Sequence, residues 1–181
     1  MKVDEDSLLK MLSSPETRRE AFTLIVKEYG ELLYWKIRHV VTTHEDTDDI
    51  LQNTFVKAWN NLDSFRGTSK ISTWLYRIAM NESLDFLRKQ KQRATVSADD
   101  DPEVANRLMA DEYFDGDETQ AQLQAAIASL PEVQRMVFTL RYFDEMKYSE
   151  ISKLLNTSEG ALKASYHFAV KKITEYFQKH D

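Results

Sequence analysis

The chain has 181 residues, of which 42% are hydrophobic, and carries a net charge of −6 with no cysteine. This length allows one large domain or two small ones, and this hydrophobic content is sufficient for packed cores. The lack of cysteine excludes a disulfide framework, a thiol nucleophile and a thiolate metal site. No apolar run approaches the roughly 20 residues of a membrane-spanning helix, and the acidic N-terminus has no signal-peptide core, so we expect a cytoplasmic protein.

Charge is distributed unevenly along the chain. Residues 94–118 contain nine acidic residues against Arg107 alone, so the remaining residues carry a net charge of +2. Within that remainder, residues 66–93 contain seven basic and two acidic residues. Clustered Lys and Arg side chains drive binding to phosphate, so a basic patch on an acidic protein favours a nucleic-acid partner.

The sequence predicts an all-α fold. Only four Gly and three Pro interrupt it, and apolar residues recur at helical rather than alternating spacing. We expect helices over residues 17–41, 46–62, 72–91 and 118–129, and a further helix from Pro131. In the second of these helices, the residues expected to face inward are Leu51, Phe55, Ala58, Trp59 and Leu62.

The stretch DSFRGTSKISTWLYRIAMN, residues 63–81, joins a cationic, hydroxyl-rich loop to a helix that begins near Trp74. One interpretation is a hydrophobic helix start capped by Ser72. The other is a pocket for a flat anionic group such as a nucleotide; Trp74 fits this pocket and a buried core equally well. Steps of three and four residues place the following side chains on the surface that the loop shares: Trp74, Arg77, Asn81, Asp85 and Arg88.

The acidic segment 94–118 is interrupted by Pro102 and Gly116 and resembles a flexible linker, within which VANRLMADEYF is able to form a transient helix. We therefore expect an N-terminal domain over residues 1–93 and a C-terminal domain over residues 119–181.

The C-terminal stretch YSEISKLLNTSEGALKASYHFAVKKI, residues 148–173, predicts a helix-turn-helix. Asn156 stands at the turn, where a left-handed backbone is needed, and Ser158 is a good N-cap for the second helix. The buried stripe of that helix comprises Leu162, Tyr166, Ala169 and Ile173. Small residues and donors on the opposite face suit a DNA major groove, namely Gly160, Lys163, Ala164, His167, Phe168 and Lys171. An ordinary helical hairpin with a solvated lysine face is the alternative.

Two blocks of sequence resemble one known family, the bacterial extracytoplasmic-function sigma factors of RNA polymerase. Residues 20–93 resemble sigma region 2, through DDILQNTFVKAWNNLDSFRGTSKISTWLYRIAMNESLDFLRKQ. Residues 119–177 resemble region 4, through LPEVQRMVF and YSEISKLLNTSEGALK. The two blocks cover most of the chain in the family's order and spacing.

The resemblance implies a two-domain helical specificity subunit that binds core polymerase, recognises promoter DNA and assists promoter melting. Region 2 would contact the coiled coil of the β′ subunit through Asp48, Asp49, Gln52 and Asn53. It would engage the non-template strand of the −10 element through the loop and third helix, with these candidate residues: Phe65, Arg66, Thr68, Ser69, Lys70, Ser72, Trp74, Arg77, Asn81, Arg88 and Lys89. An extruded base needs such a pocket with phosphate contacts beside it.

Region 4 would read the duplex −35 element and lie on the β flap. Its candidate residues are Ser158, Glu159, Gly160, Lys163, Ala164, His167, Phe168 and Lys171. The resemblance also implies an anti-sigma factor as a partner and no direct insertion into a membrane. Five positions depart from the family pattern: Asn53 stands where Glu is usual, Lys147 at a Ser or Thr helix cap, Asn156 at a turn glycine, and Ser165 and Phe168 at arginines of the recognition stretch.

On the sequence alone, two other classes of protein have to be considered. A dimeric helix-turn-helix regulator of duplex operators would need a self-complementary apolar surface and no single-strand pocket. An enzyme is disfavoured because the chain shows no nucleophile–base pair, no Gly-rich phosphate loop and no metal-ligand spacing, while Asp48 and Asp49 are adjacent at a helix start. We therefore expect no catalytic residue, cofactor or metal.

Overall fold

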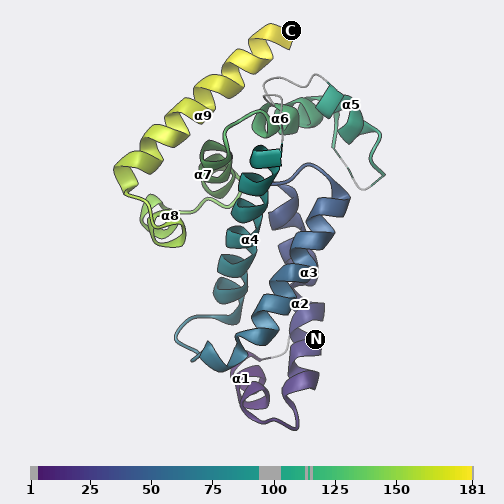
Figure 1. Ribbon diagram of the computed structural model, residues 1–181, viewed down its shortest axis with the longest axis vertical. Coiled ribbons are helices and arrows are strands. Elements are labelled where there is room, and N and C mark those ends of the chain that lie inside the picture. Colours follow the sequence, from purple (N-terminus) through teal and green to yellow (C-terminus); the bar gives the residue numbers. More distant parts are fainter. Residues whose placement is uncertain (1–3, 94–102, 113, 115, 181) are drawn as a thin grey trace.

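The structure, a computed structural model, describes residues 4–93, 103–112, 114 and 116–180. All regular elements in these ranges are helical, as the sequence predicted (Figure 1). The N-terminal part consists of α1 (Glu5–Ser13), α2 (Arg18–Arg38), α3 (His44–Asn60), the 3₁₀ turn η1 (Leu62–Ser64) and α4 (Ile71–Arg93). No helix in the described part of the chain is both long and apolar enough to span a bilayer.

The described C-terminal part contains four shorter helices and a long last helix. They are α5 (Glu103–Met109), α6 (Glu118–Ala128), α7 (Glu132–Tyr142), α8 (Tyr148–Leu155) and α9 (Glu159–His180). Helices α6, α7 and α8 all pack on α9, which lies along the outer edge of the molecule (Figure 1).

Helix α1 is an element that the sequence did not predict. Asp4 begins it as a capping residue, because its carboxylate accepts a hydrogen bond from the Ser7 N–H at 3.2 Å. Leu8 and Leu12, one turn apart, are buried against α2. A helix of nine residues is marginal in isolation, so this packing is what stabilises it.

The helix-turn-helix forms as predicted. Asn156 has a left-handed backbone, with φ 51° and ψ 49°, and ends α8. The Ser158 hydroxyl accepts a hydrogen bond from the Ala161 N–H at 3.3 Å and caps α9. At the start of α8, where Lys147 replaces a hydroxyl cap, the Glu150 carboxylate accepts the Lys147 N–H at 2.9 Å, which completes half of a capping box.

One hydrophobic core continues from the N-terminal helices into the C-terminal ones. It joins residues of α1–α4 to Met136, Val137 and Leu140 on α7. Helix α4 packs directly on α7. Beside this contact, the Asp144 carboxylate accepts hydrogen bonds from Lys36 and Tyr76, and only 4% of its side chain is exposed. The two parts of the chain are therefore packed against each other.

The segment 94–118, expected to be a linker, is described only in part, since residues 94–102, 113 and 115 lie outside the described ranges. Its described part contains α5, which packs on α6 and buries Leu108. Asp111 forms an ion pair with Arg38 at the end of α2. This portion of the segment thus contacts both parts of the protein.

Candidate nucleic-acid interface

The loop before α4 presents polar side chains to solvent. Arg66, Thr68, Ser69 and Lys70 are all exposed, and Gly67 has a φ of +68°, which a side chain would strain. Ser72 lies inside the first turn of α4 rather than before it. The backbone N–H of Ile71 at the helix start instead donates to the Glu5 carboxylate, 66 positions away in the sequence.

Trp74 lies at the border between the loop and the core. Its ring stacks on Phe65 with centroids 4.6 Å apart and planes 23° apart. Both rings are half-buried and pack against the hydrophobic core. The indole is therefore part of the packing and part of the surface beside the loop, so the geometry is compatible with both interpretations of this residue.

The outer stripe of α4 continues the cationic surface away from the loop. Arg77, Asn81, Arg88 and Lys89 are exposed. Arg88 faces Asp85 one turn before it at 3.6 Å, an exposed pair that contributes little to stability. The predicted residues of this group therefore lie along one helix and are accessible to a ligand that follows its length.

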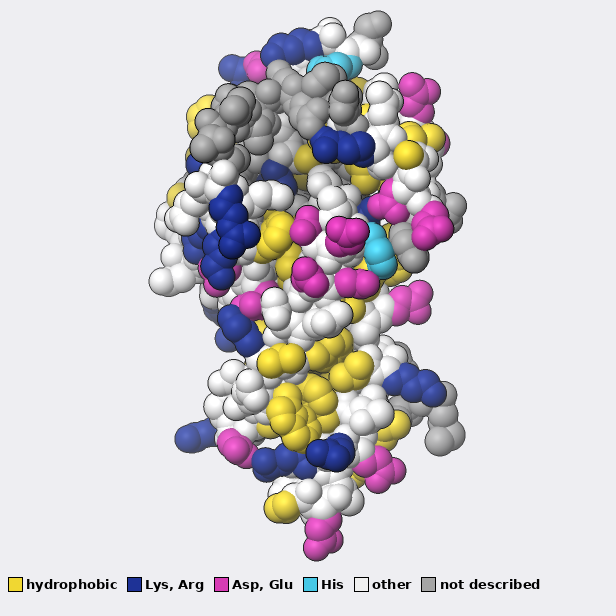
Figure 2. Space-filling view, turned by 45° about the vertical axis from the view of Figure 1, so that its right-hand side comes forward, with side chains coloured by type: hydrophobic (Ala, Val, Ile, Leu, Met, Phe, Trp, Pro, Cys, Tyr) yellow, Lys and Arg dark blue, Asp and Glu magenta, His cyan; other side chains and the backbone are white. Residues whose placement is uncertain are grey.

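The outer face of α3 forms a second surface, which is polar at one end and apolar at the other. Asp49, Gln52 and Asn53 are exposed, whereas Asp48 is half-buried and faces His44 at 3.3 Å. Figure 2 shows acidic side chains gathered above exposed hydrophobic ones on this side of the molecule.

On α3, one exposed apolar residue was not predicted from the sequence, and the orientation of another was predicted wrongly. Val56 is 58% exposed and follows Gln52 and Asn53 on the same face, a spacing that could have revealed it. Trp59, predicted to face inward, is partly exposed and packs edge-on against Phe22 at 5.1 Å. The prediction for Trp59 was wrong: Phe22 and Phe55 pack against the hydrophobic core, whereas Trp59 remains 39% exposed.

The third surface is the outer face of α9. All eight residues predicted for it are exposed: Ser158, Glu159, Gly160, Lys163, Ala164, His167, Phe168 and Lys171. The opposite stripe packs inward as predicted, with Leu162, Ala169 and Ile173 buried and Tyr166 half-buried. Lys163 lies 5.7 Å above the Tyr148 ring, so its ammonium is directed toward the start of α8.

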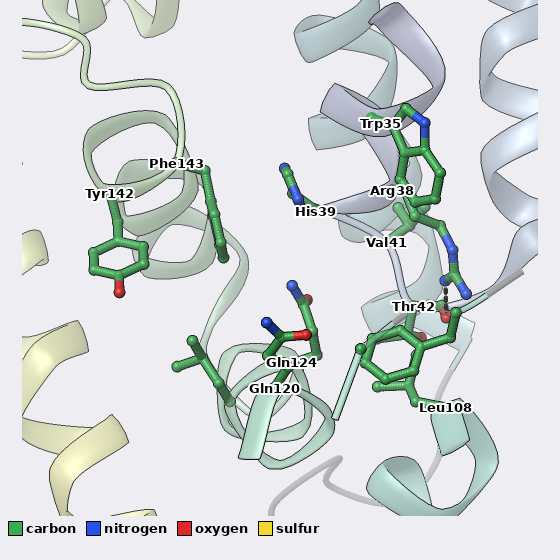
Figure 3. Close-up of a pocket in the computed structure, with 13 residues that line it drawn as sticks. Trp35, Arg38, His39, Val41, Thr42, Leu108, Gln120, Gln124, Tyr142 and Phe143 are labelled. Atoms are coloured by element: carbon green, nitrogen blue, oxygen red, sulfur yellow. Dashed lines mark hydrogen bonds between the residues drawn. The ribbon is translucent and has the colours of Figure 1, made fainter. Parts of the chain in front are cut away.

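A cavity of about 390 Å³ lies away from these three surfaces, where α2, α6 and α7 meet (Figure 3). Trp35, His39, Gln124, Tyr142 and Phe143 contribute to its lining, and none of the predicted site residues does. Among the described residues, no group of three or more His, Asp or Glu side chains could hold a metal ion. The site residues predicted from the sequence thus lie on three surfaces of separate helices, and none of them lines this cavity.

Comparison with known proteins finds similarity in both parts of the chain. Residues 25–93 match the model of sigma-70 region 2, and residues 120–173 match that of sigma-70 region 4. The chain is 33% identical over 158 residues to the ECF RNA polymerase sigma factor SigW of Bacillus subtilis, covering 82% of this chain and 84% of that protein. It is also 33% identical over 160 residues to the ECF RNA polymerase sigma-E factor of Escherichia coli, covering 81% of each.

Two solved structures share the fold. CnrH in complex with the cytosolic domain of CnrY has a TM-score of 0.66 at 22% identity, over 98% of this chain and 99% of that one. RpoE of Bartonella quintana in complex with the anti-sigma factor NepR has a TM-score of 0.62 at 19% identity, over 87% and 96%. The two matched regions and the similarity to SigW and sigma-E together show that this chain belongs to the extracytoplasmic-function sigma factors of RNA polymerase.

Proposed function

We propose that this sigma factor divides promoter recognition among the three surfaces. The outer face of α3 binds the β′ coiled coil of core polymerase, the loop 65–70 with α4 holds the −10 non-template strand, and α9 reads the −35 duplex. The observation that carries this assignment is the continuity of the exposed loop, the Phe65–Trp74 stack and the cationic stripe of α4. Stacking rings beside a cationic track suit a single strand, whereas a helix-turn-helix suits a duplex.

The closed packing of the two parts supports a further element of this proposal. Regions 2 and 4 separate when the protein binds polymerase, and residues 94–118 serve as the connection between them. An anti-sigma factor stabilises the packed form in the cytoplasm. Support comes from the two solved structures of this fold, one bound to the cytosolic domain of CnrY and the other to an anti-sigma factor. We assign no catalytic step to the chain.

Promoter opening tests the division of labour. Lys70→Ala, Trp74→Ala and Arg77→Ala should each reduce open complex on a duplex promoter about tenfold, because one stacking or pocket contact contributes roughly 1–3 kcal/mol. Permanganate footprinting measures the opening. A template already mismatched across the −10 element should partly rescue these variants.

Variants of the lysines on α9 should show the opposite behaviour, with a defect in duplex binding rather than in strand opening. Lys163→Ala and Lys171→Ala should weaken capture of the −35 duplex and reduce its salt dependence, without rescue by the mismatched template. Lys172→Ala is the matched control, because this exposed lysine lies off the predicted face of the same helix. Normal duplex opening by a folded Trp74→Ala protein would assign Trp74 to the core alone.

A further inference from the structure

The loop 65–70 has little support of its own, because most of its side chains are exposed. Its attachment points therefore determine how well it is ordered. The described contacts link α1 directly to the C-terminal end of the loop, through Arg18 of α2 to its N-terminal end, and through Leu9 to Gly67 between them.

The first attachment is at the C-terminal end of the loop. The Glu5 Oε1 atom accepts a hydrogen bond from the Ile71 N–H at 2.6 Å. The first N–H groups of a helix have no partner within the helix, and Lys70, which precedes Ile71, has no side-chain acceptor to cap them. A carboxylate is also favoured at the electropositive start of a helix. Glu5 thus acts as the cap of α4 from a distant position in the sequence.

The second attachment is at the N-terminal end of the loop. Arg18 donates from Nε to the Leu12 carbonyl in the last turn of α1 at 3.1 Å. The same guanidinium pairs with Asp63 of η1, with Nη1 and Oδ1 3.0 Å apart. Arg18 therefore ties the end of α1 to the turn from which the loop begins. Since Asp63 is largely exposed, the ion pair itself contributes modestly.

The third contact lies between these ends. The methyl carbons of Leu9 are 3.7 and 3.9 Å from the position that a Cβ on Gly67 would occupy. A cavity of about 330 Å³ opens there, with α1 residues Leu9, Leu12 and Ser13 on one side and Phe65, Arg66 and Gly67 on the other. The burial of Leu8 and Leu12 holds helix α1 itself in place.

We propose that α1 is a brace for the loop 65–70, and that Glu5 is a positioning residue for −10 binding through its hydrogen bond to Ile71 at the start of α4. The brace rests on the proposed function of the loop. It acts by limiting the conformations of the loop before DNA arrives, so that less ordering is needed on binding.

Variants of Glu5 in the full chain bound to core polymerase test the brace. Glu5→Ala should weaken binding of a single-stranded −10 oligonucleotide about fivefold, as expected for loss of a helix cap. Glu5→Gln keeps an acceptor oxygen and should remain within about twofold of the wild type. Glu5→Asp keeps the charge but is one methylene shorter, so it should resemble Glu5→Ala. Asp6→Ala, an exposed acid on the same turn, is the control.

Two further measurements separate positioning from a general loss of structure. Binding of a −35 duplex should be the same in all four variants, and amide exchange at Ile71 should accelerate in Glu5→Ala and Glu5→Asp but not in Glu5→Gln. If Glu5→Ala does not fold, the comparison of Glu5→Asp with Glu5→Gln carries the same test.

Different results would contradict the brace and the proposed role of the loop in holding the −10 strand. If Glu5→Ala binds the strand as well as or more tightly than the wild type, while Lys70→Ala binds it weakly, the brace is wrong but the loop assignment stands. Tighter binding by Glu5→Ala would mean that the Glu5 carboxylate competes with the phosphates of the strand. Unchanged binding by both Lys70→Ala and Trp74→Ala would instead show that the loop does not hold the strand, and the brace would fall with it.

Discussion

His39, at the end of α2, makes the closest ring contact between regions 2 and 4. Its imidazole stacks on Phe143 with centroids 4.3 Å apart and planes 10° apart. Its Nδ1 atom is buried and has no hydrogen-bond partner among the described residues. Burial lowers the pKa of His39 from its ordinary value of 6.5; Asp144 opposes this effect, and Lys36 adds to it.

The lowered pKa of His39 predicts a pH dependence of stability. Below about pH 6.5 the unfolded chain binds a proton that folded His39 does not, so the free energy of unfolding should decrease as the pH falls. This decrease should end below the pKa of His39 in the folded protein. The measurement is urea unfolding at about pH 7.5 and about pH 5.5.

His39→Phe provides the control for this titration, because it keeps an aromatic ring against Phe143 and removes the ionisable group. The pH dependence should be smaller in the variant than in the wild type. An identical pH dependence in both proteins would show that His39 does not contribute to it.

At the scale of elements, helices with apolar residues at helical spacing were predictable whether long or short, and α1 was not. Helices α2, α3, α4 and α6 begin and end within a few residues of the positions that the sequence indicated. Helix α1 was missed because its stability comes from packing on α2 rather than from its own nine residues.

Candidate site residues were likewise predictable where their position depends on local spacing and unpredictable where it depends on tertiary packing. The exposure of the cationic loop and of the outer faces of α4 and α9 could be predicted, because local spacing determines which residues share a helix face. The role of Glu5 could not be predicted, because its contact with Ile71 depends on how α1 packs in three dimensions.

Helix α5 gives a prediction at this scale. Leu108 is 4% exposed, so Leu108→Ala should lower the free energy of unfolding by about 2–3 kcal/mol. Its neighbour Met109 is 50% exposed, and Met109→Ala should cost much less. Urea unfolding of both variants measures the difference. If Leu108→Ala lowers the free energy of unfolding no more than Met109→Ala does, α5 contributes no buried packing to the folded protein.

At the scale of the whole molecule, the interface between regions 2 and 4 combines apolar packing with buried polar contacts. Asp144 accepts from both Lys36 and Tyr76 across this interface. Burial raises the pKa of the Tyr76 hydroxyl, and the Asp144 charge raises it further, so Tyr76 stays protonated as a donor. Lys91 on α4 adds an exposed pair with Glu132 on α7 at 3.3 Å. The proposed separation of regions 2 and 4 would break these contacts.

The most direct measurement is gel filtration of the protein with and without core RNA polymerase. The wild type should elute as a monomer when alone and with the polymerase when mixed. Asp49→Arg combined with Gln52→Ala should remain in its own peak, because it changes the exposed polar face of α3. Lys70→Ala should still elute with the polymerase, because the loop faces DNA in the proposed arrangement. A folded Asp49→Arg, Gln52→Ala protein that still elutes with the polymerase would contradict the α3 docking face, and a dimer that never joins the polymerase would contradict the sigma-factor mechanism itself.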